Sequence, residues 1–234
     1  MKSETCIPWA AFLLAAFLPC APCRAQDKTS CEVSVAALSL PDGSDGLLHW
    51  RAADAGTSPL QLSTRYFSAH VKIPGNVIQF FKDPVPEGKN PSPPPVPLIT
   101  VTIPNDTKLA YIVLWAGSDP SGKAGWKSTV FRGEDWKASS MKVLNSCSET
   151  IGLIADRKQI KLPRGQAMDF PSRDWNEPFP VKIYRSKPVT KLVFSSTWRV
   201  SAGHRELCFI GSAGGAVTLR SLMDLAVPPA KAAP

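Results

Sequence analysis

Hydrophobic and polar residues alternate along much of this chain with the two-residue period of β-strands. In residues 98–103, isoleucine and valine alternate with threonine, and in 60–63 leucine alternates with polar residues. Residues 109–115 are apolar at every position. That pattern predicts a strand in the middle of a packed sandwich, with both of its faces covered.

The most regular stretch lies at 141–170, which predicts two or three short strands joined by turns. Residues 145–148 read Asn-Ser-Cys-Ser and supply turn-forming side chains. In 158–162, Ile160 and Leu162 alternate with polar residues, and the following Pro-Arg-Gly is typical of a turn in which glycine takes a positive φ. No catalytic motif lies in this stretch, so it indicates architecture rather than activity.

About a dozen such segments recur at spacings of roughly 8 to 12 residues, and no window has an apolar stripe of helical period. We therefore predict an all-β protein, an antiparallel β-sandwich of one or two units with little helix. The predicted organisation begins with a loosely structured N-terminal arm at residues 26–58. Two β-sandwich units follow at 59–135 and 136–226, divided near 133–140, and a disordered tail follows at 227–234.

Residues 1–25 have the pattern of a cleaved secretory signal. A basic Lys2 precedes an apolar run over 7–18, and Ala25 offers the small residue that signal peptidase requires before the cut. The run is too short to span a bilayer, which needs about 20 residues. We expect export to the periplasm or the extracellular space, with no transmembrane segment after cleavage. Lipid anchoring through Cys20 or Cys23 is the less favoured alternative, because proline precedes each.

Cysteine content and charge add two constraints. Cleavage would leave Cys31, Cys147 and Cys208, an odd number, so at most one disulfide can form within the chain. Cys147 with Cys208 is the candidate pair, and three buried thiols acting as small apolar residues are the equal alternative. The formal charge of +8 falls to +7 once Lys2, Arg24 and Glu4 are removed. The basic residues are scattered singly, so a solvated basic surface is favoured over a dedicated polyanion site, and nucleic acid is not expected as a partner.

Motifs that carry chemistry are absent or incomplete, so we predict no catalytic residue, no metal and no cofactor. The phosphate-loop-like 117–124 ends in alanine where a hydroxyl should hold Mg²⁺, and a strand-like segment follows where a helix is needed. The spacing of Ser139 and Lys142 matches Ser/Lys acylating enzymes, but their segment reads as a strand rather than the helix that motif requires. The three histidines, His49, His70 and His204, have no partner at metal-ligand spacing.

Tryptophans near strand ends supply the only candidate ligand surface. Trp115, Trp126, Trp136 and Trp175 lie near predicted strand ends or in loops, and Trp126, Trp136 and Trp175 would form a sugar-stacking platform if the fold gathers them on one exposed face. Burial in the core is the competing fate of these rings, and it is the commoner one in a small sandwich.

Several runs of residues together resemble a family of exported bacterial β-sandwich proteins to which no activity is assigned. The resemblance covers about 60–225 and is carried by 62–68 (Leu-Ser-Thr-Arg-Tyr-Phe-Ser), the strand pair around Pro104, 143–145 with 160–165, 196–198 (Ser-Thr-Trp) and a closing basic strand that ends in Asp224. The middle unit is also similar to that of periplasmic accessory proteins of alginate O-acetylation. Neither resemblance implies a catalytic residue.

Together these features predict an exported, non-catalytic protein of the cell envelope that acts by binding or structural association, with an envelope protein or a polysaccharide as partner. One alternative is a carbohydrate- or polyanion-binding accessory module. The other is a hydrolase whose site is assembled from distant residues, which would need an acidic side chain beside His70 or His204 in a pocket.

Overall fold

The structure, a computed structural model, describes ten segments of the chain: residues 30–40, 44–52, 56–85, 95–118, 124–155, 157–170, 177–185, 190–200, 202–213 and 216–225. The predicted signal at 1–25 and the predicted tail at 227–234 lie outside these segments.

The described residues form strands and turns, and no helix occurs among them. The strands are β1 (Ser30–Ala37), β2 (Leu47–Ala52), β3 (Ser58–Gln61), β4 (Val71–Pro74), β5 (Val77–Phe81), β6 (Ile99–Thr102), β7 (Leu109–Ser118), β8 (Ala124–Arg132), β9 (Ser140–Asn145), β10 (Ile151–Ala155), β11 (Lys158–Leu162), β12 (Ala167–Asp169), β13 (Phe179–Arg185), β14 (Lys191–Trp198), β15 (Arg205–Ala213) and β16 (Ala216–Asp224).

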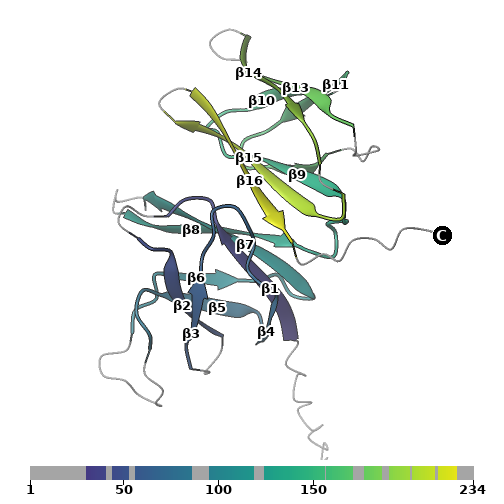
Figure 1. The fold of residues 1–234 in the computed structure, drawn as a ribbon. Helices are drawn as coiled ribbons and strands as arrows, with labels where there is room; N and C mark the ends of the chain where they lie inside the picture. The colour runs from purple at the N-terminus through teal and green to yellow at the C-terminus, as the bar shows by residue number, and fades with distance from the viewer. Residues whose placement is uncertain are drawn as a thin grey trace, which may run out of the picture.

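These strands make four sheets of four, which pack as two sandwiches (Figure 1). In the first unit, sheet A (β4-β1-β7-β8) faces sheet B (β3-β2-β5-β6), and in the second, sheet C (β12-β9-β15-β16) faces sheet D (β11-β10-β13-β14). The predicted all-β sandwich class is confirmed. Its strands are antiparallel except in two pairings, β1 with β7 and β9 with β15, which are parallel.

Three apolar cores account for the stacking of the sheets. One fills the first sandwich between sheets A and B, with Phe80 and Ile112 among its buried residues, and a second fills the other sandwich around Leu153 and Ile183. The third joins sheets A and C and includes Tyr111, Val113 and Leu207 from the two facing sheets. The layers therefore follow the order B, A, C, D, and sheets A and C are covered on both faces.

The prediction of a loosely structured arm over 26–58 is wrong for the part that the structure describes. β1 lies between β4 and β7 in sheet A, and five of its residues in a row are buried. β2 lies between β3 and β5 in sheet B. The first unit thus begins by residue 30 rather than at 59, while its end at Arg132 and the start of β9 at Ser140 agree with the predicted division at 133–140.

The stretch 141–170 forms strands as predicted, but they do not belong to a single sheet. β9 and β12 pair in sheet C, whereas β10 and β11 form a hairpin in sheet D. The turn after β9 carries the chain from one layer to the other. Asn145 ends β9 with its side chain fully buried, and its amide donates to the carbonyls of Glu149 (2.8 Å) and Leu162 (2.9 Å).

A short backbone pairing also ties the two units together. Tyr66 of the first unit forms a parallel bridge with Met223 of β16. The Phe67 amide donates to the Met223 carbonyl (3.0 Å), and the Met223 amide donates to the Arg65 carbonyl (2.9 Å). Residues 65–67 therefore extend sheet C at its β16 edge.

Candidate functional site

The interface between sheets A and C is closed at one end and open at the other. The pairing of β15 with β16 explains this difference, because alternate pairs of their residues face unit 1. Along the strands these pairs are Arg205 with Asp224, then Leu207 with Leu222, and finally Gly211 with Thr218. The first pair lies in a buried polar cluster, the leucines lie in the third core, and the last pair lines a cleft.

The closed end is a cluster of aromatic and charged side chains. Asp224 is 1% exposed and accepts a hydrogen bond from the Tyr111 hydroxyl. Arg205 donates from Nη1 to the Tyr111 hydroxyl (2.8 Å) and to Asp224 (3.4 Å), and from Nε to the Trp136 carbonyl. Burial, and then the Asp224 carboxylate, raise the pKa of Tyr111 well above its usual range, so the hydroxyl stays protonated and acts as a donor.

His70 lies at the edge of this cluster. Its Nε2 is 3.7 Å from Asp224 Oδ1 and its Nδ1 is 4.0 Å from Glu32 Oε2. The structure therefore does bring acidic side chains beside a histidine, as the hydrolase alternative requires. Asp224, however, is already engaged by Tyr111 and Arg205, and neither His70 nor these acids line either of the two cavities described below.

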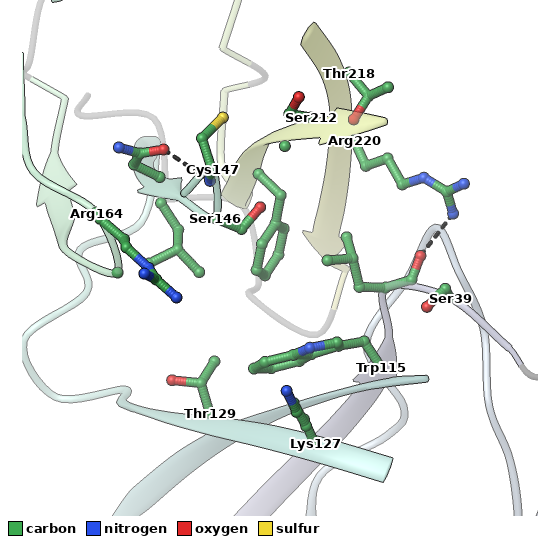
Figure 2. Close-up of a pocket in the computed structure, with 16 residues that line it drawn as sticks. Ser39, Trp115, Lys127, Thr129, Ser146, Cys147, Arg164, Ser212, Thr218 and Arg220 are labelled. Atoms are coloured by element: carbon green, nitrogen blue, oxygen red, sulfur yellow. Dashed lines mark hydrogen bonds between the residues drawn. The ribbon is translucent and has the colours of Figure 1, made fainter. Parts of the chain in front are cut away.

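At the open end, sheets A and C separate to form a cleft of about 500 Å³ (Figure 2). Its walls come from both units: β7, β8 and the end of β1 on one side, and β15, β16 and the turns at 145–147 and 164–165 on the other. Its polar lining consists mainly of hydroxyl and cationic groups, from Ser39, Thr129, Ser146, Ser212, Thr218, Lys127, Arg164 and Arg220. Among the described residues that line it, none is acidic.

Unit 1 contributes an aromatic ring and a cation to the cleft. Trp115 and Lys127 are cross-strand partners on β7 and β8, and Val113 and Thr129 are the next pair on the same face. The Trp115 ring is half-buried, and Lys127 is exposed. Figure 2 shows the side chains of Trp115, Lys127 and Thr129 close together on the unit 1 side of the cleft.

Unit 2 places Arg164 in the cleft through a turn that Asn145 holds in position. The backbone N–H of Asn145 donates to the Gln166 carbonyl (3.1 Å), and the backbone carbonyl of Asn145 accepts from the Gly165 N–H (2.8 Å). Gly165 has a φ of +71°, which favours glycine, as the sequence predicted for this turn. Asn145, which is buried and whose backbone and side-chain amides are both hydrogen-bonded, thus holds the loop that carries Arg164.

The third cation, Arg220, bridges the two units. Its Nη1 donates to the Leu38 carbonyl at the end of β1 (2.7 Å), which leaves the remaining donors of the guanidinium for the cleft. Within the part of the chain that the structure describes, no hydrogen bond or ion pair engages the ends of the Lys127 and Arg164 side chains. The described part of the cleft therefore combines three positive charges and contains no carboxylate to neutralise them.

The predicted tryptophan platform is not assembled. Trp136 is 0% exposed and packs edge-on against Tyr111 in the third core, with ring centroids 5.0 Å apart, so it is wrong as a ligand-stacking residue. Trp126 is half-buried against the first core, and Trp175 lies outside the described residues. The aromatic residue that does line the cleft is Trp115, which the sequence placed near a strand end with the other three tryptophans but which was not among the three expected to form the platform.

The candidate disulfide between Cys147 and Cys208 is not formed. Both are buried free thiols, as is Cys31 on β1, so the alternative of small apolar residues describes all three. Burial raises the pKa of each thiol, that of Cys208 to about 12.

Ser139 and Lys142 have roles in the fold. Ser139 accepts a hydrogen bond from the Gly203 amide (2.8 Å), and Lys142 on β9 pairs with Asp169 on β12. Among the described segments, no group of three or more His, Cys, Asp or Glu side chains is placed to hold a metal ion, and no helix is long and apolar enough to cross a bilayer.

Fold and site together define an all-β protein of two stacked sandwiches with a basic cleft between them. No protein-family model matches the chain, and no curated protein matches its sequence.

Proposed function

We propose that this is an exported, non-catalytic binding protein whose inter-unit cleft takes an acidic saccharide. The observation that carries the proposal is the one-sided charge of the cleft: Lys127, Arg164 and Arg220 line it together, and none of the described residues that line it is acidic. Export is supported by the secretory pattern of residues 1–25, and it would expose the mature chain to envelope and extracellular polysaccharides.

Electrostatics favours an anion in this position. Two unit charges about 4 Å apart interact by about 1 kcal/mol in bulk water and by about 4 kcal/mol at the effective dielectric of a protein surface. An exposed ion pair within the protein would already have used part of this energy, but Lys127 and Arg164 have no such partner among the described residues. A carboxylate or sulfate group entering the cleft therefore meets cations that have not been neutralised.

The remaining lining suits a sugar better than a bare inorganic anion. Trp115 offers an apolar ring surface on which the C–H face of a pyranose can pack. Five hydroxyl side chains, those of Ser39, Thr129, Ser146, Ser212 and Thr218, can each donate or accept a hydrogen bond with sugar hydroxyls. A cleft of about 500 Å³ falls within the range of sites for small molecules.

The test is calorimetric titration of the mature chain with tetragalacturonate, an acidic saccharide, and with maltotetraose, a neutral one of equal length. We expect the acidic sugar to bind more tightly, and its affinity to fall when the ionic strength is raised from about 0.02 M to about 0.15 M. Arg164→Gln and Lys127→Gln should each weaken binding by about fivefold, corresponding to roughly 1 kcal/mol.

Lys158→Gln provides the matched control, because Lys158 is an exposed lysine on β11 and does not line the cleft. It changes the net charge of the protein by the same amount as Lys127→Gln. Equal weakening by Lys158→Gln and Lys127→Gln would show a general charge effect and refute the proposed site, as would equal affinity for the two saccharides.

A further inference from the structure

The outer face of sheet D has a glycine at its centre. Gly152 on β10 lies between Lys161 of β11 and Tyr184 of β13 in one cross-strand row, and Leu192 of β14 completes that row. The row faces away from the second core, because the buried residues of β10 are its neighbours Ile151 and Leu153. Lys161 and Leu192 are exposed, and Gly152 and Tyr184 are half-buried.

Nothing in the fold requires glycine at this position. Gly152 is not among the residues with positive φ, so its backbone conformation is open to any amino acid. A Cβ atom built on it would lie 3.6 Å from the Tyr184 Cβ, an ordinary van der Waals contact. At Gly133, by contrast, a Cβ would lie 2.5 Å from Leu109 Cγ, so glycine is a steric requirement there.

Glycine in the interior of a strand weakens the strand, and it often marks a place where a ligand or another backbone comes close. At Gly152 no side chain covers the backbone of β10, and this backbone forms the floor of a hollow of about 780 Å³ on the surface of sheet D. Ile154, Gln159, Lys161 and Tyr184 form its sides.

The chemistry of these sides is that of a site for a neutral, hydroxyl-rich ligand. Tyr184 and Ile154 provide apolar surface next to the floor, while the Gln159 amide both donates and accepts hydrogen bonds. In the described segments, no hydrogen bond or ion pair engages the ends of the Gln159 and Lys161 side chains. The other cation of the hollow, Arg185, is paired with Glu149.

We propose that this hollow is a second binding site, which takes a neutral pyranose chain. One sugar ring would lie over the backbone at Gly152, with its C–H face against Tyr184 and Ile154 and its hydroxyls toward Gln159 and Lys161. The site is independent of the cleft, since the hollow is on the outer face of the last layer and the cleft is between sheets A and C.

The glycine allows a test in which loss of binding is separated from loss of fold. Gly152→Val places a branched side chain on the floor of the hollow, where the sugar ring would lie, and it raises the β-propensity of the strand, so the melting temperature should stay equal or rise. Gly125→Ala is the matched control, because Gly125 is also a strand glycine with open space at its Cβ position, and it lies on β8 away from the hollow.

Binding is measured by saturation-transfer NMR and titration with four short oligosaccharides: an α-glucan, a β-glucan, a chitin fragment and a polygalacturonate fragment. We expect at least one neutral sugar to bind with an affinity that depends little on salt. Gly152→Val should weaken that binding at least about tenfold, the effect of losing one central contact, while Gly125→Ala and Arg164→Gln leave it unchanged.

Two further variants, Gln159→Ala and Lys161→Gln, alter only exposed side chains and serve if Gly152→Val does not fold. They should weaken binding of the neutral sugar without changing the melting temperature. Absence of neutral-sugar binding to the wild-type chain, or full affinity in a folded Gly152→Val variant, would overturn the proposal. Salt-sensitive binding of the polygalacturonate fragment alone, abolished by Arg164→Gln, would support the cleft and refute the hollow.

Discussion

The buried charge cluster between the two units makes a sharp prediction about stability. Asp224 is 1% exposed, and the Arg205 side chain is 18% exposed. The change Asp224→Leu removes the carboxylate and leaves Arg205 without its ionic partner in a largely dry interface. Removing one member of a buried pair typically costs about 3 to 5 kcal/mol, because the remaining charge is desolvated and uncompensated.

For a chain of this length, each kcal/mol corresponds to a shift in melting temperature of about 2 to 4 °C. We therefore expect Asp224→Leu to lower the melting temperature by roughly 6 to 20 °C. Arg205→Met should have an effect of similar size, because the buried carboxylate of Asp224 keeps the Tyr111 hydroxyl as a donor but loses the positive charge of Arg205.

The double variant Asp224→Leu/Arg205→Met separates charge from packing. With both charges gone, apolar side chains can fill the interface, and most of the lost free energy should return. The assay is urea denaturation of wild type, both single variants and the double variant, analysed as a double-mutant cycle. Asp169→Ala is the control, because Asp169 is 61% exposed and its pair with Lys142 should contribute about 1 kcal/mol or less. A double variant as unstable as the sum of the two singles would refute the reasoning.

Two further predictions concern other buried positions. Because burial raises the pKa of Cys208 to about 12, the folded state holds this proton more tightly than the unfolded state, and stability that is present below about pH 9 should be lost as the pH rises toward 12. Between pH 9 and 11 the free energy of unfolding should decrease with pH more steeply in wild type than in Cys208→Ala, and the two slopes should differ by about 1 kcal/mol per pH unit. Urea titrations in which the two proteins lose stability with the same slope would contradict this. Gly133→Ala would place a methyl group 2.5 Å from Leu109 Cγ, so it should cost about 1 to 3 kcal/mol. The same change in a Leu109→Ala background should cost less, and equal costs measured by denaturation would show that the contact is unimportant.

Strands could be predicted from the sequence where their own residues show the hydrophobic pattern, and not where burial depends on segments far away in the chain. The all-apolar run 109–115 predicted a strand covered on both faces, and β7 does lie between β1 and β8 with residues 110–114 fully buried. Residues 33–35 alternate as a short strand does, but they were assigned to a loose arm because the segments that cover β1 lie far away in the sequence. Ser34 looks like an exposed polar position in the sequence, yet it is fully buried and its hydroxyl donates to the Ser68 carbonyl (2.6 Å).

The candidate site was less accessible to sequence reasoning. Each of its cations, Lys127, Arg164 and Arg220, is an isolated basic residue in the sequence, and scattered basic residues predicted only a solvated surface. The structure brings them together because sheets A and C of the two sandwiches face each other, and their interface is packed in the third core at one end and lined by these cations at the other. The position of Trp115 near the end of a long apolar strand did mark it as one of four candidate rings, but nothing in the local sequence showed that this strand end lines a cleft between the two units.

The bridge between Tyr66 and Met223 has a consequence for the order of assembly. Residues 65–67 are synthesised long before β16, the strand they pair with, which is the last strand in the described part of the chain. The first sandwich can complete its own core before β16 exists, and domains generally fold in order of synthesis. The joint between the units therefore closes last, and a chain truncated before residue 223 would present residues 65–67 as an unpaired edge for another molecule to occupy.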